Sequence, residues 1–312
     1  MAAHEDATGI RAAAAAPILR RVMAALVAGL VVCSVPRAAQ ARQEVFASAE
    51  QAADAFVEAL STSDEAAMRR VLGDDYRKIL PLEDTDRDDV DRFLSAWSKS
   101  HRIEQDGADR AVLAVGDDDW ELPVPIVKQG AGWRFDTRAG RDEILTRRIG
   151  KNELSAMQVA LAYYDAQKEY AEQDRNGDGI LEYAQKFLST PGKHDGLSWA
   201  TGPDEPESPF GPLPAEVTPE GAYHGYDYRI LTAQGPHAPG GAYDYLVRGR
   251  MIAGFALVAW PARWGETGVM TFLVSHDGKL YEKDLGPRTA EIARAMSRFD
   301  PDGSWRVVQP PE

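Results

Sequence analysis

The sequence predicts an α+β protein of two domains, each with helices followed by an antiparallel sheet. Apolar residues recur at helical spacing before residue 100, and again from residue 141 for about eight turns. After each helical region, apolar residues alternate with polar ones, which is typical of half-buried strands joined by short turns. The pattern returns from strand to helix after residue 137. We therefore predict domains at 42–137 and 138–312.

Residues 1–41 have the pattern of an export signal peptide. Arginines precede an apolar run at 22–35, and Ala39 and Ala41 supply the small residues that a signal peptidase reads. The run is shorter than the roughly 20 residues of a membrane-spanning helix, and no later stretch approaches that length. We expect cleavage after Ala41 and a periplasmic or secreted mature protein without a membrane span. Cys33, the only cysteine, lies in the run, so the mature chain would have no disulfide.

The acidic balance of the chain bears on its partners. The net charge is −14, and removal of the signal peptide takes away four arginines and only two acidic residues. Such a surface repels nucleic acid and anionic lipid, so we expect neither as a partner. Divalent cations, cationic partners and simple solubility remain open.

The first domain reads as three short helices and a three-stranded meander. Ser48 and Gln51 form a capping box, and Ser63 begins a second helix. The expected strands are 111–115, 120–127 and 132–136, with two prolines pushing the middle strand toward an edge or a bulge. This order resembles the cone-shaped NTF2-like fold, which often encloses a pocket. The polar residues that are candidates for lining such a pocket are Tyr76, His101, Glu121 and Arg134.

The second domain begins with the long helix. A further helical turn is expected at 181–188, and Pro287 begins a terminal helix that reaches Phe299. The expected strands are 226–232, 251–260, 269–275 and 279–284. A long helix on a four-stranded antiparallel sheet resembles the head of a type IV pilin or pseudopilin. Pilins begin with an apolar membrane helix, whereas a soluble domain precedes this helix, so the resemblance implies a soluble module that does not polymerise by that route.

One stretch has spacing that suggests specific chemistry, the loop at 174–182. Ca²⁺ takes six to eight oxygen ligands, and alternate positions of this loop offer oxygens as in an EF-hand. The candidate metal ligands are Asp174, Asn176, Asp178, the carbonyl of Ile180 and Glu182. Position 12 holds Gln185 where a sensor loop has a bidentate Glu. An Asp/Asn/Gly-rich turn without an ion is the alternative.

Five segments carry a closer resemblance, at 174–185, 189–197, 208–213, 254–261 and 268–272. They resemble an exported bacterial family catalogued as domain of unknown function 2950. The resemblance covers nearly all of the mature chain. It implies no reaction.

The chain shows no complete catalytic motif. Residues 196–200 approach a nucleophile elbow but lack its closing Gly, and Ser275, His276 and Asp277 stand at a turn tip where a triad does not form. No catalytic residue is therefore predicted, and Ca²⁺ is the one cofactor suggested. Two functions remain open: an exported, non-enzymatic envelope module that binds a protein partner, or a small-molecule binder or unrecognised hydrolase with a pocket in the first domain. Three histidines lie in loops, at 194, 224 and 237, and their open alternatives are a shared metal site or scattered surface positions.

Overall fold

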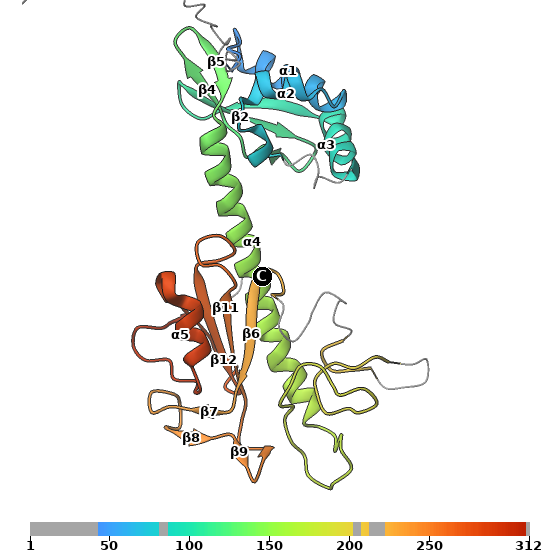
Figure 1. The fold of residues 1–312 in the computed structure, drawn as a ribbon, viewed down its shortest axis with the longest axis vertical. Coiled ribbons are helices and arrows are strands. Elements are labelled where there is room, and N and C mark those ends of the chain that lie inside the picture. The colour runs from blue at the N-terminus through green and yellow to red at the C-terminus, as the bar shows by residue number, and fades with distance from the viewer. Residues whose placement is uncertain (1–42, 81–86, 202–206, 212–221, 310–312) are drawn as a thin grey trace, which may run out of the picture. The chain divides into compact units, whose positions relative to one another are not determined.

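The computed structural model describes residues 43–80, 87–201, 207–211 and 222–309. The predicted signal peptide and its cleavage site lie outside these residues. Helices and antiparallel sheets make up the described chain, which confirms the α+β class (Figure 1). Among the described residues, no helix has both the length and the apolar character that a membrane crossing requires.

Side-chain caps begin the first two helices, one of them at the predicted residue. The Ser48 hydroxyl accepts a hydrogen bond from the backbone N–H of Gln51 at 3.2 Å, as the capping box requires. The second helix is capped by Asp64 and not by Ser63, because the Asp64 carboxylate accepts bonds from two backbone N–H groups of its first turn. The helices are α1 (Ala49–Ser61), α2 (Glu65–Leu72), the 3₁₀ turn η1 (Tyr76–Lys78) and α3 (Arg87–Lys99).

The sheet of the first half has the order β1-β2-β4-β5, with β3 paired to the end of β2. The predicted strand at 120–127 is split into β3 and β4, because Pro123 and Pro125 cannot donate to a ladder. Strand β1 was not predicted. The strands are β1 (His101–Gln105), β2 (Arg110–Val115), β3 (Trp120–Glu121), β4 (Ile126–Gln129) and β5 (Gly132–Phe135). Helices α1 and α3 pack against this sheet, and Phe56 contacts Phe135 in the core.

The long predicted helix is a single element, α4 (Thr137–Tyr170). It begins a turn before residue 141 because the Asp136 carboxylate caps it, accepting from the backbone N–H of Ala139 at 3.1 Å. Small and aromatic side chains of its C-terminal half, such as Ala160 and Tyr163, are buried in a core with the second sheet.

The second sheet has five antiparallel strands in the order β14-β13-β12-β11-β6, one more than predicted. All six residues of β11 are buried, because α4 packs against β11, β12 and β13 while α5 packs against β11. The added strand β14 is short and mostly exposed, so its pattern was not recognisable. The elements are β6 (Tyr226–Leu231), β11 (Ala256–Pro261), β12 (Met270–Ser275), β13 (Leu280–Asp284), η2 (Gly286–Arg288), α5 (Thr289–Ala295) and β14 (Arg306–Val308).

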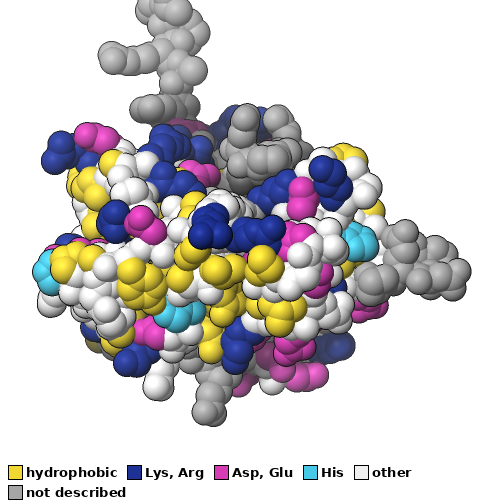
Figure 2. Space-filling view, turned by 90° about the horizontal axis from the view of Figure 1, so that it is seen from below, with side chains coloured by type: hydrophobic (Ala, Val, Ile, Leu, Met, Phe, Trp, Pro, Cys, Tyr) yellow, Lys and Arg dark blue, Asp and Glu magenta, His cyan; other side chains and the backbone are white. Residues whose placement is uncertain are grey.

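Two short ribbons complete the second half. They pair β7 (Ala233–Gln234) with β8 (Tyr243–Asp244), and β9 (Leu246–Val247) with β10 (Arg250–Met251). Seen from below, the molecule shows patches of hydrophobic side chains among basic and acidic ones (Figure 2). Val247 of β9 is one of the exposed hydrophobic residues.

Two predicted helical segments of the second half differ from the structure. The segment 181–188 is extended and not helical, because the backbone N–H of Tyr183 bonds to the carbonyl of Met251 at 2.7 Å. The terminal helix is shorter than predicted, since α5 ends at Ala295. There the Arg229 guanidinium donates to carbonyls at its C-terminal end, including that of Ala293 at 2.7 Å.

Candidate functional site

The acidic loop follows the end of α4, and the Asp174 carboxylate organises its backbone. One oxygen of Asp174 accepts from the N–H groups of Gly177 and Asp178 at 2.8 and 3.2 Å, and the other accepts from Gly179 at 2.7 Å. These bonds, that of Gly179 foremost, lower the pKa of Asp174. Gly177 and Gly179 have φ of 74° and 84°, which a residue without a side chain adopts at least cost. The loop is therefore closed by its own residues.

The other predicted ligands lie along this closed loop. The Asn176 amide oxygen accepts from the Asp178 N–H at 3.1 Å, and its nitrogen donates to Glu182 Oε1 at 2.6 Å. One Asp178 oxygen accepts from the Ile180 N–H at 3.1 Å. The Ile180 carbonyl accepts no hydrogen bond from a described residue. The structure thus brings positions 3 and 9 of the loop into direct contact.

A basic side chain from a distant strand enters the same loop. Arg250 Nη1 of β10 lies 2.5 Å from Asp178 Oδ2. The contact with Asp178 and the charges of Glu182 and Asp174 raise the pKa of Arg250. Burial raises the pKa of Glu182, Arg250 opposes this, and Asp178 and Asp174 add to it. Three carboxylates therefore act on one guanidinium. Sequence reasoning did not find Arg250, since no local signal marks it.

The far end of the loop is anchored in the core. Gln167 of α4 is fully buried, and its side chain makes three hydrogen bonds. Its Nε2 donates to Tyr163 Oη at 3.0 Å and to the Ala184 carbonyl at 2.8 Å, and its Oε1 accepts from the Ala184 N–H at 2.8 Å. Gln185 donates instead to the Gly249 carbonyl at 2.8 Å. Position 12 is therefore occupied by a residue that ties the loop to the β9–β10 hairpin.

The residue chemistry fits a hard cation, although the described side chains are not arranged as a metal centre. Among the residues that the structure describes, no three His, Cys, Asp or Glu side chains form a group that could hold a metal. The loop still offers carboxylate oxygens that accept a single hydrogen bond, such as Asp174 Oδ2 and Asp178 Oδ1, and each of these has a second lone pair. An ion would therefore need Asp178 and Glu182 to turn from their present partners.

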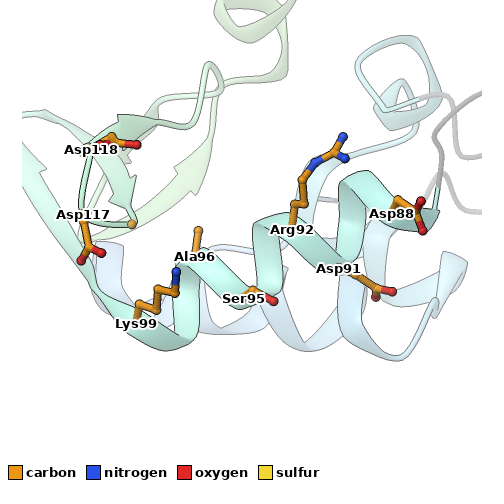
Figure 3. Close-up of a pocket in the computed structure, with 9 residues that line it drawn as sticks. Asp88, Asp91, Arg92, Ser95, Ala96, Lys99, Asp117 and Asp118 are labelled. Carbon is orange, nitrogen blue, oxygen red and sulfur yellow. The ribbon is translucent and has the colours of Figure 1, made fainter.

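The first half has a surface pocket of about 700 Å³ between α3 and the turn that joins β2 to β3 (Figure 3). The pocket is strongly charged, with a single apolar side chain in its wall. It is lined by Asp88, Asp91, Arg92, Ser95, Ala96, Lys99, Gly116, Asp117 and Asp118.

The four polar residues predicted for a pocket do not line this one. Tyr76 is fully buried, and Arg134 donates to the Gln43 side chain at 2.8 Å. The His101 ring stacks on Trp97 at 3.7 Å between ring centroids. Glu121 is exposed at the end of β3. These positions do not bring the four side chains together around one ligand.

The loop histidines have separate partners. His194 stacks on Trp199 with ring centroids 4.4 Å apart, and His237 Nδ1 lies 3.1 Å from Asp300 Oδ2. His224 packs against its neighbour Tyr223. The three rings are thus held in three different environments.

The Ser-His-Asp sequence forms a turn, as expected. Ser275 Oγ donates directly to Asp277 Oδ1 at 2.8 Å, while His276 Nε2 lies 3.2 Å from the hydroxyl of Tyr243. His276 is therefore not between the hydroxyl and the carboxylate, as a triad requires. In the elbow-like segment, Ser198 Oγ donates to the Gly211 carbonyl at 2.8 Å, which is a structural role.

Comparison with known proteins gives a family but no activity. No curated protein and no solved structure matches the chain. The family described as "Protein of unknown function (DUF2950)" matches residues 43–308. That match spans most of the chain, including the acidic loop and both sheets. The chain therefore belongs to the DUF2950 family.

Proposed function

We propose that this chain is an exported, non-enzymatic module of the cell envelope or the secreted fraction, which binds a protein partner and holds a structural Ca²⁺ in the loop at 174–182. The observation that supports Ca²⁺ binding is the ordered backbone of the loop. Asp174 fixes its backbone through three hydrogen bonds, so the oxygens of Asn176, Asp178 and Glu182 are presented on an already ordered turn.

Preorganisation and oxygen chemistry together favour Ca²⁺ over other ions. Ca²⁺ accepts irregular sets of carboxylate, amide and carbonyl oxygens, which are the donor types present here. Little backbone ordering remains to oppose binding, since the loop is closed without the ion. The neutral Gln185 at position 12 favours a weak site, with a Kd of about 10⁻⁴ to 10⁻³ M, as is typical of extracellular modules.

The test for the ion is calorimetric titration of the purified protein with Ca²⁺ after removal of divalent ions. Glu182→Gln should weaken binding at least tenfold while keeping the turn, because the Glu182 carboxylate supports no backbone group of the loop. Glu172→Gln is the matched control, with the same charge change just outside the loop. No heat, together with no rise in melting temperature at 10 times the expected Kd, would eliminate the site.

The interaction role is supported by the finer fold resemblances. A long helix against an antiparallel sheet is the plan of a pilin-like head, and helices on a meander are the plan of an NTF2-like domain.

The test of export is processing in the native host. Replacing Ala39 and Ala41 by Phe should leave an uncleaved precursor, whereas Ala38→Phe should be processed. Equal processing of both variants would contradict the predicted cleavage site.

The pocket along α3 supports a second candidate, a binder of small molecules. The side-chain carboxylates of Asp91, Asp117 and Asp118 make no hydrogen bond or ion pair with a described residue, so the pocket offers free carboxylates to an amine. Spermidine is a suitable probe in thermal-shift measurements. The double substitution Asp117→Asn with Asp118→Asn should abolish its effect. An equal shift in the double mutant would count against the pocket.

A further inference from the structure

The loop already contains a cation of its own. Both oxygens of Asp178 are occupied, Oδ1 by the Ile180 N–H at 3.1 Å and Oδ2 by Arg250 Nη1 at 2.5 Å. The negative charges of Glu182 and Asp174 also favour the charged guanidinium of Arg250, after the contact with Asp178 itself. A guanidinium therefore takes the place of a counter-ion among the same carboxylates that are proposed to bind Ca²⁺.

Arg250 is held in this place by the backbone and not only by its charge. The carbonyl of Met251 accepts from the Tyr183 N–H at 2.7 Å, and the carbonyl of Gly249 accepts from the Gln185 side chain at 2.8 Å. These two bonds flank Arg250 on β10 and join it to the chain that leaves the loop. The hairpin thus fixes the distance from the Arg250 backbone to Asp178.

We infer that Arg250 is a built-in counter-cation that competes with Ca²⁺ for Asp178 and so sets the affinity of the loop. This inference rests on the proposed function. An ion that takes an oxygen of Asp178 either displaces the guanidinium or lies beside a positive charge, and both lower its affinity. The loop would keep its shape without metal because Arg250 neutralises part of its charge, and ion binding would exchange one cation for another.

The experiment compares Ca²⁺ titrations of the wild type with those of Arg250→Gln and Arg250→Lys. Arg250→Gln should bind Ca²⁺ at least tenfold more tightly than the wild type, since it removes the competing charge and leaves the hairpin backbone bonds in place. Without Ca²⁺, it should melt at a lower temperature, and saturating Ca²⁺ should raise its melting temperature more than that of the wild type. Arg250→Lys should stay close to the wild type, because the positive charge is kept.

The matched control is Arg248→Gln, which removes the same charge two residues away in the same hairpin. The Ca²⁺ affinity of Arg248→Gln should match that of the wild type. This result would separate direct competition at Asp178 from the effect of the protein's overall charge. If the wild type binds Ca²⁺ and Arg250→Gln binds it with equal or lower affinity, the inference is overturned but the Ca²⁺ site is supported. Binding by Arg250→Gln alone would support the inference. An absence of binding in every variant would overturn both.

Discussion

Replacing Gln167 by Met should destabilise the second half strongly. The side-chain amide of Gln167 takes the place of a neighbouring strand's peptide group. It donates to the Ala184 carbonyl and accepts from the Ala184 N–H, both at 2.8 Å. Methionine has a similar length but offers neither a strong donor nor a strong acceptor. The two backbone groups of Ala184, a residue that is 2% exposed, would be left without partners.

The magnitude follows from those two groups. A buried polar group left unsatisfied costs about 1 to 3 kcal/mol, so two of them give about 2 to 6 kcal/mol. The loss of the bond to Tyr163 adds little, because that hydroxyl also donates to the Ala256 carbonyl at 3.2 Å. We therefore expect Gln167→Met to lower the free energy of unfolding by about 3 kcal/mol.

The assay is urea unfolding of the full chain, with hydrogen exchange of the peptide around Ala184 as a local readout. Gln185→Met is the matched control, since Gln185 is exposed and donates one hydrogen bond to the Gly249 carbonyl. It should cost less than about 1 kcal/mol. If the two variants lose equal stability, or if the Ala184 amide stays protected in Gln167→Met, the reasoning about this network is wrong.

Two further predictions concern glycine and pH. Gly268→Ala should destabilise the protein by several kcal/mol, because the added Cβ would lie 2.2 Å from the Tyr226 hydroxyl. Gly150→Ala should instead stabilise it by about 0.5 to 1 kcal/mol, since Gly150 lies in α4 and an added Cβ meets nothing within 4 Å. Equal changes in the urea midpoints of the two variants would contradict this. Burial would raise the pKa of Asp195, but hydrogen bonds from Lys186 and Thr190 outweigh it and lower the pKa to about 2, from 3.8 for the free group. Because the folded pKa is the lower one, the stabilisation is present above pH 3.8 and is lost as the pH falls through about 2. The Asp195 side chain is 34% exposed, so Asp195→Asn should cost only about 1 kcal/mol at pH 7. The difference from the wild type should vanish below about pH 2, and a difference that persists there would refute the assignment.

The sequence by itself determined the features that depend on neighbours along the chain. The helix Thr137–Tyr170 follows from one long periodic pattern with a capping Asp. The hydrogen bonds of Asp174 join residues no more than five positions apart, so glycine spacing and side-chain chemistry were enough to predict a closed turn. The split of the strand at 120–127 follows from its prolines, because their missing N–H groups act locally.

The tertiary structure alone decided which distant groups share the loop. Arg250 reaches Asp178 from 72 positions away, and no residue near Arg250 signals that contact. The segment at 181–188 has a helical pattern, yet it is extended because Gln167 and Met251 supply partners to its backbone. Local preferences between helix and strand differ by about 1 kcal/mol or less per residue, so a few buried long-range hydrogen bonds outweigh them.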